Sequence, residues 1–231
     1  VAVGNELMEV GGTFDEMTDE IIVGTGASGD ALQGLSDVAT NIGTSVPTSF
    51  AAAGDIVQEF NTRMGLSGDT LQEVGSKAAS LQNIVGSVNF DNLTGAFSEW
   101  GISGEQAGSE MDYLFGVAQQ TGIGFDSLVS VVQNAGPAMQ QLGFSFEDTA
   151  DMAGQLDKAG LNASGVMGSM KKALSSVAEQ GGDVQQAFHD SVDAIQGYID
   201  AGDTASAISA ASDIFGTRNA PQFVAALRSG A

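Results

Sequence analysis

The chain has 231 residues, 42% of them hydrophobic, with 32 glycines, three prolines and no cysteine. This composition is too apolar for a disordered polyelectrolyte, it supplies enough core for one large or two small domains, and it excludes disulfides and thiolate metal sites. The 29 acidic residues against seven basic ones give a net charge of −22, which argues against nucleic-acid binding through a basic face, so we expect no sequence-specific contact with DNA or RNA.

The first residues of the chain carry no targeting signal. They are acidic and lack the basic region and apolar run of a signal peptide. No apolar stretch approaches the ~20 residues that a bilayer requires, so we expect no membrane contact for this segment. Because the chain begins at Val1, we expect it to be a piece of a longer protein. We predict that residues 1–24 form an acidic helical lead-in, and that 25–231 form a helical module with a sub-boundary near 86–102.

The segment 20–35 contains a G-x-G-x-x-G pattern directly after three apolar residues. A dinucleotide-binding turn would need a buried strand before this pattern, a helix after it, and an acid about 20 residues later at the end of a second strand. Residues 45–53 cannot supply the second strand, because they read as a proline-marked turn and an alanine-rich helix start. We therefore interpret Gly24 and Gly26 as the end of one helix and Ser28 as the N-cap of the next.

The second half of the chain has apolar residues at helical spacing. Each stripe repeats every three or four residues, whereas the alternation typical of strands is hard to find anywhere. We predict an all-α fold of short amphipathic helices packed as antiparallel helical hairpins or a bundle, with no β-sheet. The stripes fall within residues 106–118, 125–135, 146–156, 167–178 and 184–199.

A second pattern recurs at the predicted helix ends: Gly, an apolar residue, Ser, any residue and an acid. It occurs at 65–69, 101–105 and 143–147, with looser copies at 122–126 and 160–164. Gly supplies the left-handed residue that ends a helix, Ser accepts a hydrogen bond from the first free amides of the next helix, and the acid meets the positive end of its dipole. We expect these roles for Gly26, Ser28, Gly65, Ser67, Gly101, Ser103, Gly143, Ser145 and Gly160.

Candidate catalytic residues are few. His189, the one histidine of the chain, could pair with Asp193 one helical turn later, but a metal site there would need all its other ligands from carboxylates. We therefore interpret His189 as a solvated side chain. No calcium-loop pattern and no G-x-S-x-G turn with triad partners occur, and the methionines have the spacing of core residues. Lys171 and Lys172, the single adjacent basic pair, are a weak partner signal. We predict no enzymatic activity, no cofactor and no metal.

Several segments resemble, in order, the core region of phage tail tape measure proteins of the TP901 type. Residues 25–32 resemble the opening TGAS-x-x-x-L, and 65–69 resemble the G-[LI]-S helix start. The segment 136–148 is similar to AP-x-A-x-x-x-G-[LIF]-S-x-E, and 156–174 to LA-x-x-G-[LI]-x-[AG]-S followed by [LM]-[RK]-x-A-L. Residues 214–220 resemble the helix end [LI]-FG-x-R, which adds Phe215 and Gly216 to the expected structural residues. The resemblance covers residues 20–231.

This resemblance implies a structural virion protein in the lumen of a long phage tail. Such a protein sets tail length during assembly and leaves the tube ahead of DNA at ejection. It implies several partners: other copies of the chain, as a trimer on the tail axis, the tail tube, the tail-tip or distal tail proteins, and the tail assembly chaperones. Because glycine interrupts the helices about every 20 residues, we expect a folded helical module rather than a continuous coiled-coil rod.

Two other classes of protein stay open at this point. A secreted or membrane-interacting bacterial helical protein would use the same amphipathic helices as an interaction surface. Interfacial helices usually carry Lys or Arg on their polar face, and the first 62 residues contain neither. A cofactor-binding enzyme would depend on the G-x-G-x-x-G pattern alone.

Overall fold

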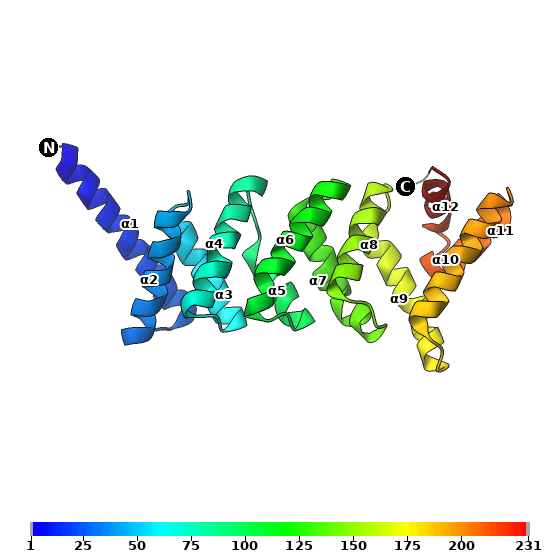
Figure 1. Ribbon diagram of the computed structural model, residues 1–231, viewed down its shortest axis with the longest axis horizontal. Helices are drawn as coiled ribbons and strands as arrows, with labels where there is room; N and C mark the ends of the chain where they lie inside the picture. Colours follow the sequence, from blue (N-terminus) through cyan, green and yellow to red (C-terminus); the bar gives the residue numbers. More distant parts are fainter. Residues whose placement is uncertain (1, 230–231) are drawn as a thin grey trace. The chain divides into compact units, whose positions relative to one another are not determined.

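The computed structural model describes residues 2–229, and the side chains of residues 13–228. These residues form twelve α-helices and no β-strand (Figure 1), which confirms the predicted all-α fold. The helices are α1 (Ala2–Thr25), α2 (Gly29–Ser45), α3 (Phe50–Met64), α4 (Gly68–Val85), α5 (Phe90–Trp100), α6 (Gly104–Thr121), α7 (Phe125–Gln141), α8 (Phe146–Lys158), α9 (Ala163–Glu179), α10 (Val184–Asp200), α11 (Thr204–Phe215) and α12 (Ala220–Ser229).

Successive helices are joined by only three or four residues. At ten of the eleven connections the chain turns at a glycine whose φ lies between 67° and 94°, a conformation that glycine adopts without a Cβ clash. Gly65 and Gly101 are examples in which this left-handed residue closes the helix. The exception follows α2, where Val46 is extended because it precedes Pro47. Connections this short fold each helix back on the one before it.

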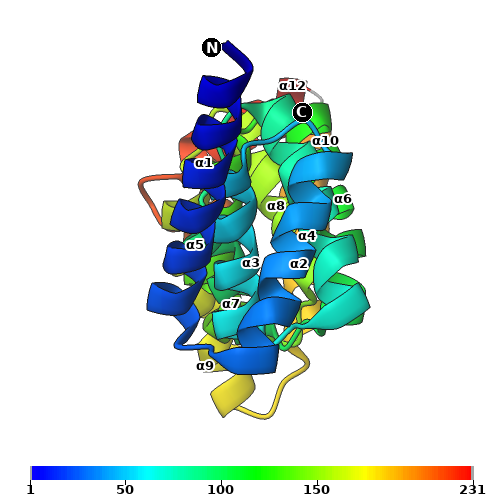
Figure 2. The same ribbon diagram turned by 90° about the vertical axis from the view of Figure 1, so that its left-hand side faces the viewer.

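The chain divides into two compact units, and the division falls inside α6, between Asp112 and Tyr113. In the first unit α3 is central: it packs on α1, α2, α4 and α5, while α2 also packs on α1 and α4. Figure 2 looks onto α1 and α2, with α3 behind them. The division of the chain into a lead-in and a module, predicted from the sequence, stays a prediction.

The first unit has a continuous apolar core between these helices. Its largest fully buried side chains come from six helices, α1 to α6, and each contributes about 1.5–3 kcal/mol to folding. They are Met17, Ile21, Ile42, Ile56, Phe60, Leu71, Leu93, Phe97 and Met111. Two glycines allow close helix crossings: Gly54 lies against Met17 of α1, and Gly75 lies against Ile42 of α2.

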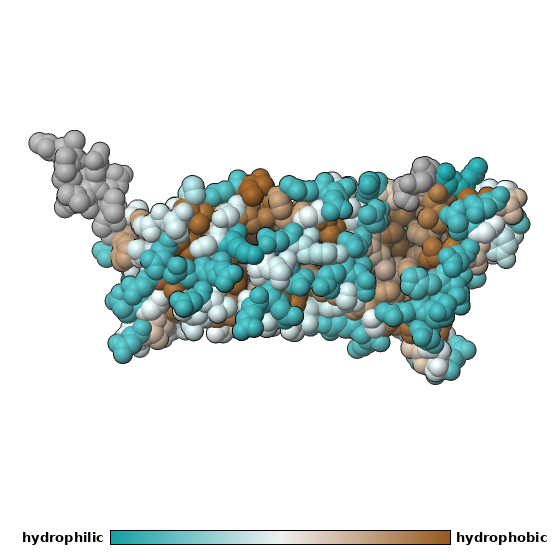
Figure 3. Space-filling view, viewed as in Figure 1, coloured by the Kyte–Doolittle hydropathy of each residue, from teal (hydrophilic) through white to brown (hydrophobic). Residues whose placement is uncertain are grey.

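In the second unit α7, α9 and α11 contact one another in sequence, and α8, α10 and α12 pack on them. The apolar stripes predicted from the sequence supply its core, for example Leu114, Leu128 and Leu174, which are fully buried. Gly154 of α8 lies against Val117 on the part of α6 that belongs to this unit. On the face seen in Figure 3, polar side chains cover most of the helices and apolar ones show in the hollows between them.

Candidate functional site

The expected cap residues Ser28 and Ser67 lie at helix starts but make no side-chain capping bond. The prediction that these serines accept a hydrogen bond from the first amides of the helix is wrong. In both cases the first residue of the helix is a glycine with a left-handed φ, 59° at Gly29 and 56° at Gly68. An ordinary helix start has a right-handed φ at this position, so here the first free amides do not reach the serine hydroxyl.

Ser145, in contrast, caps α8 by a reciprocal pair of hydrogen bonds. Its Oγ accepts from the amide of Asp148 at 3.0 Å, and Oδ2 of Asp148 accepts from the amide of Ser145 at 3.1 Å. The preceding Gly143 ends α7 with a φ of 86°. After Gly160 a related cap begins α9, where the side-chain oxygen of Asn162 accepts from the amide of Gly165 at 2.7 Å.

Gly101 and Ser103 lie in the connection between α5 and α6. The amide of Ile102 donates to the carbonyl of Phe97, which closes α5 in the manner of a Schellman turn. The amide of Ser103 donates to the side chain of Gln106 at 3.1 Å, and the Ser103 carbonyl accepts from the amide of Gln106. The side chain of Gln106 thus provides one half of a capping box.

Phe215 and Gly216 end α11 and tie it to its neighbours. Phe215 is 1% exposed, and its ring centroid lies 3.8 Å from that of Phe223 on α12 and 6.4 Å from that of Phe188 on α10. Gly216, with a φ of 81°, turns the chain toward α12. The aromatic contacts therefore hold three successive helices together.

The G-x-G-x-x-G segment does not have the geometry of a phosphate-binding turn. A helix precedes it instead of a strand, and Gly24 lies inside that helix, where it approaches Gln58 of α3. The amide of Gly26 already donates to the carbonyl of Ile22 at 2.8 Å, and the amide of Ala27 donates to Oγ1 of Thr25. The backbone groups that would hold a phosphate are therefore used to end α1.

His189 is exposed on α10, beside a cleft that it lines together with Asp148, Asp151 and Phe188. Asp151 also accepts a hydrogen bond from Tyr113, and burial together with that bond raises the pKa of the Tyr113 hydroxyl. Among the described residues no three His, Asp or Glu side chains converge to hold a metal ion.

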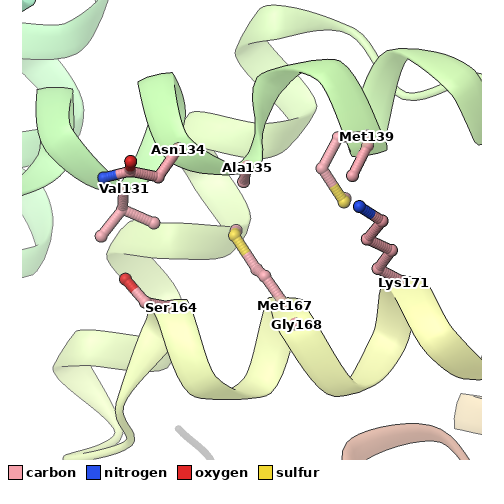
Figure 4. A pocket seen from close by; sticks show the side chains of 9 residues that line it. Val131, Asn134, Ala135, Met139, Ser164, Met167, Gly168 and Lys171 are labelled. Carbon is pink, nitrogen blue, oxygen red and sulfur yellow. The ribbon is translucent and has the colours of Figure 1, made fainter.

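A groove between α7 and α9 is the best-defined apolar concavity of the second unit. Its volume is about 110 Å³, and α7 and α9 supply all of its lining: Val131, Asn134, Ala135, Ala138, Met139, Ser164, Met167, Gly168 and Lys171. Figure 4 shows Lys171 reaching toward Met139 at one end and Val131 facing Ser164 at the other. The helical periodicity of these two segments predicts core residues and does not indicate a groove. The one signal was the Lys171–Lys172 pair.

Charge is distributed unevenly along the chain. Arg63 and Lys77, the two basic residues before Lys158, are paired: Arg63 with Glu59 and Asp91, and Lys77 with Asp112 at 2.9 Å. Lys171 and Lys172 have no ion-pair partner among the described residues. Residues 127–145 contain no charged side chain, and in 159–178 these two lysines are the only charged residues. The groove is therefore a carboxylate-free strip on a strongly acidic chain.

A series of short helices joined at glycines defines an all-α protein. The family described as phage-related minor tail protein matches residues 36–219, and the chain belongs to this family. It is thus a phage tail protein that assembles with other tail components. No curated protein and no solved structure shows significant similarity to it. No helix in the described part of the chain is long and apolar enough to cross a bilayer.

Proposed function

We infer that the chain is a folded helical module of a tape measure protein of the TP901 type, housed in the lumen of a long phage tail. The observation that carries this proposal is the ordered series of glycine-and-cap motifs along the chain. From Gly26 to Gly216 these motifs lie at helix ends, in the order that resembles the tape-measure core. Membership of the minor tail protein family supports the same assignment.

Within such a protein, this module is distinct from the extended segment that acts as a ruler. An unbroken α-helix of this length would extend about 350 Å, at 1.5 Å per residue. Connections at glycine instead divide the chain into helices of 10–24 residues that pack on each other. We therefore propose that tail length is set by the whole tape measure protein, and that this chain forms a folded element of it inside the tube.

The surface chemistry suits a protein that shares a narrow tube with DNA. A net charge of −22 repels phosphates, so the module can leave the tube ahead of DNA without binding it. Short helices joined at glycines can unfold one at a time, at a lower free energy than the whole module, for passage. The partners we propose are the tail tube, the tail-tip or distal tail proteins, the tail assembly chaperones and other copies of the chain, as a trimer on the tail axis.

The test is the fate of the chain at DNA ejection. Purified virions, and tails left after triggered ejection, would be digested at Glu and analysed by quantitative mass spectrometry, because seven basic residues give few tryptic peptides. We expect peptides of this chain in intact virions and at least a tenfold loss of them after ejection, with the tube protein retained as the internal control. Retention of the chain in emptied tails, or its absence from virions, would overturn the proposal.

A further inference from the structure

We propose that the α7–α9 groove is a docking site for the outward face of helix α1 of a second copy of this chain. The groove offers partly exposed apolar side chains, Val131, Ala135 and Ala138, beside the cationic Lys171. A complementary ligand is a helix that presents apolar side chains next to carboxylates. This proposal concerns a contact between copies and does not depend on the tape-measure role.

Helix α1 presents such a face. Met17 and Ile21 are fully buried against the first unit, so the opposite side of the helix points to solvent. That side carries Asp15, Asp19, Ile22 and Val23, which follow one another at helical spacing. Val23 is 86% exposed and Ile22 is 39% exposed, and both are among the most exposed large apolar residues of the described chain. Asp15 and Asp19 have no ion-pair partner among the described residues.

The two faces match in charge as well as in polarity. The walls of the groove lack carboxylates over residues 127–145 and 159–178, so an acidic helix meets no like charge there. Asp15 or Asp19 can pair with Lys171 at the rim while Ile22 and Val23 cover Val131 and Ala135.

The contact joins different surfaces of the two copies, so it is heterologous and repeats from copy to copy. It buries one helix face in a shallow groove, and contacts of this size are weak and short-lived. The appropriate assay is therefore covalent capture. The absence of native cysteine makes this assay specific, because each introduced thiol is the only one in its chain.

The first experiment uses two single-cysteine variants of the 231-residue chain, one of which carries a tag of different mass. Val23→Cys places the thiol on α1, and Ser164→Cys places it at the end of the groove. After mixing and treatment with a short bis-maleimide, we expect a mixed dimer at least fivefold more abundant than with Ile84→Cys, which replaces a residue 65% exposed on α4. A yield equal to that control would overturn the proposal. A further variant carries both Val23→Cys and Ser164→Cys in one chain. Cross-linking within single chains of this variant, without any mixed dimer, would also overturn the proposal, because the groove would then be occupied by the chain's own α1.

The second experiment fills the groove without damaging the fold. Gly168 lies in α9 with nothing within 4 Å of a Cβ built on it, so Gly168→Leu projects into the groove from an unstrained helix. Gly197 of α10 has the same surroundings outside the groove, so Gly197→Leu is the matched control. We expect Gly168→Leu to reduce the cross-linking yield at least fivefold and Gly197→Leu to leave it unchanged. Equal yields for the two variants would contradict the assignment.

Charge reversal identifies the partner helix. Lys171→Glu in the groove chain is expected to lower cross-linking about fivefold to tenfold, because an attraction becomes a repulsion. Asp19→Lys in the α1 chain is expected to restore the yield when mixed with Lys171→Glu. Loss without rescue by either Asp19→Lys or Asp15→Lys would show that a helix other than α1 occupies the groove, and the proposal would fail.

Discussion

Ser145 and Asp148 satisfy each other's backbone amides at the start of α8, through hydrogen bonds of 3.0 and 3.1 Å. We predict that Ser145→Ala lowers the free energy of unfolding by about 1 kcal/mol, because one amide of the first turn loses its acceptor. Ser28→Ala and Ser67→Ala remove hydroxyls that make no capping bond. Each of these two variants is therefore expected to change the free energy of unfolding by less than about 0.5 kcal/mol. Urea titrations followed by circular dichroism measure the difference. Equal losses for all three variants would show that the serines are equivalent.

The contact between α1 and α3 is expected to strengthen on acidification. Partial burial, together with the nearby carboxylates of Asp55 and Glu16, raises the pKa of Glu20. Partial burial and the nearby carboxylate of Glu59 raise the pKa of Asp55 in the same way. The folded state therefore binds more protons than the unfolded state at pH values just above 4 to 5. Stability falls as pH rises through that window, and the penalty is fully present at neutrality.

The single tryptophan, Trp100, lies in the first unit and reports this effect by fluorescence. We expect the urea midpoint of the Trp100 transition to rise when the pH is lowered from 7 toward 5, and Glu20→Gln to raise it at pH 7 and flatten the dependence. Glu73→Gln, at an exposed position on α4, is the control. A midpoint that is independent of pH, or that falls in this range, would contradict the prediction.

Asp203 is expected to give the opposite pH dependence in the second unit. Its carboxylate caps α11 by accepting from the amide of Ser206 at 3.0 Å. Hydrogen bonds from the Ser206 side chain, and then from the Ser206 amide, lower the pKa of Asp203. The stabilisation is therefore present above the ordinary carboxyl pKa and is lost as pH falls through the lowered value. Asp203→Asn keeps a capping oxygen, so we expect the variant to retain stability at pH 7 and to lose less than the parent chain below pH 4. Identical acid curves for the two chains would count against this role.

Two helix glycines are predicted to respond in opposite directions to alanine. A Cβ on Gly75 would lie 2.6 Å from Cδ1 of Ile42, which is fully buried, so Gly75→Ala is expected to destabilise the first unit by about 1–2 kcal/mol. A Cβ on Gly168 meets open space, so Gly168→Ala is expected to stabilise the second unit by about 0.5–1 kcal/mol through helix propensity. Thermal unfolding by calorimetry measures both, and a stabilising Gly75→Ala would show that the α2–α4 crossing is looser than described.

The helical periodicity was sufficient to predict the fold class and much of the core. Ala107, Met111 and Leu114 recur at helical spacing and are buried. A Ser followed by Phe, Glu and Asp was also sufficient to predict the cap at Ser145, because all the partners are local in sequence. The same pattern wrongly predicted capping bonds at Ser28 and Ser67, each of which is followed directly by a glycine. The left-handed φ of that glycine sets the position of the first amides and is not visible in the sequence.

The α7–α9 groove could not be predicted, because it depends on how two helices cross. The sequence does not distinguish Gly168, which borders open space, from a helix glycine packed against a neighbouring helix such as Gly75. The unpaired lysine was visible in the sequence as part of a basic pair. Its position beside an apolar, carboxylate-free strip was not.

The most direct test of the tape-measure account is cryo-electron microscopy of intact virions compared with tails that have ejected their DNA. The account predicts helical density inside the tube of intact tails, into which the packed short helices of this chain fit, and an empty lumen after ejection. Density for this chain on the outside of the tube, or inside a tube that has already released its DNA, would contradict it.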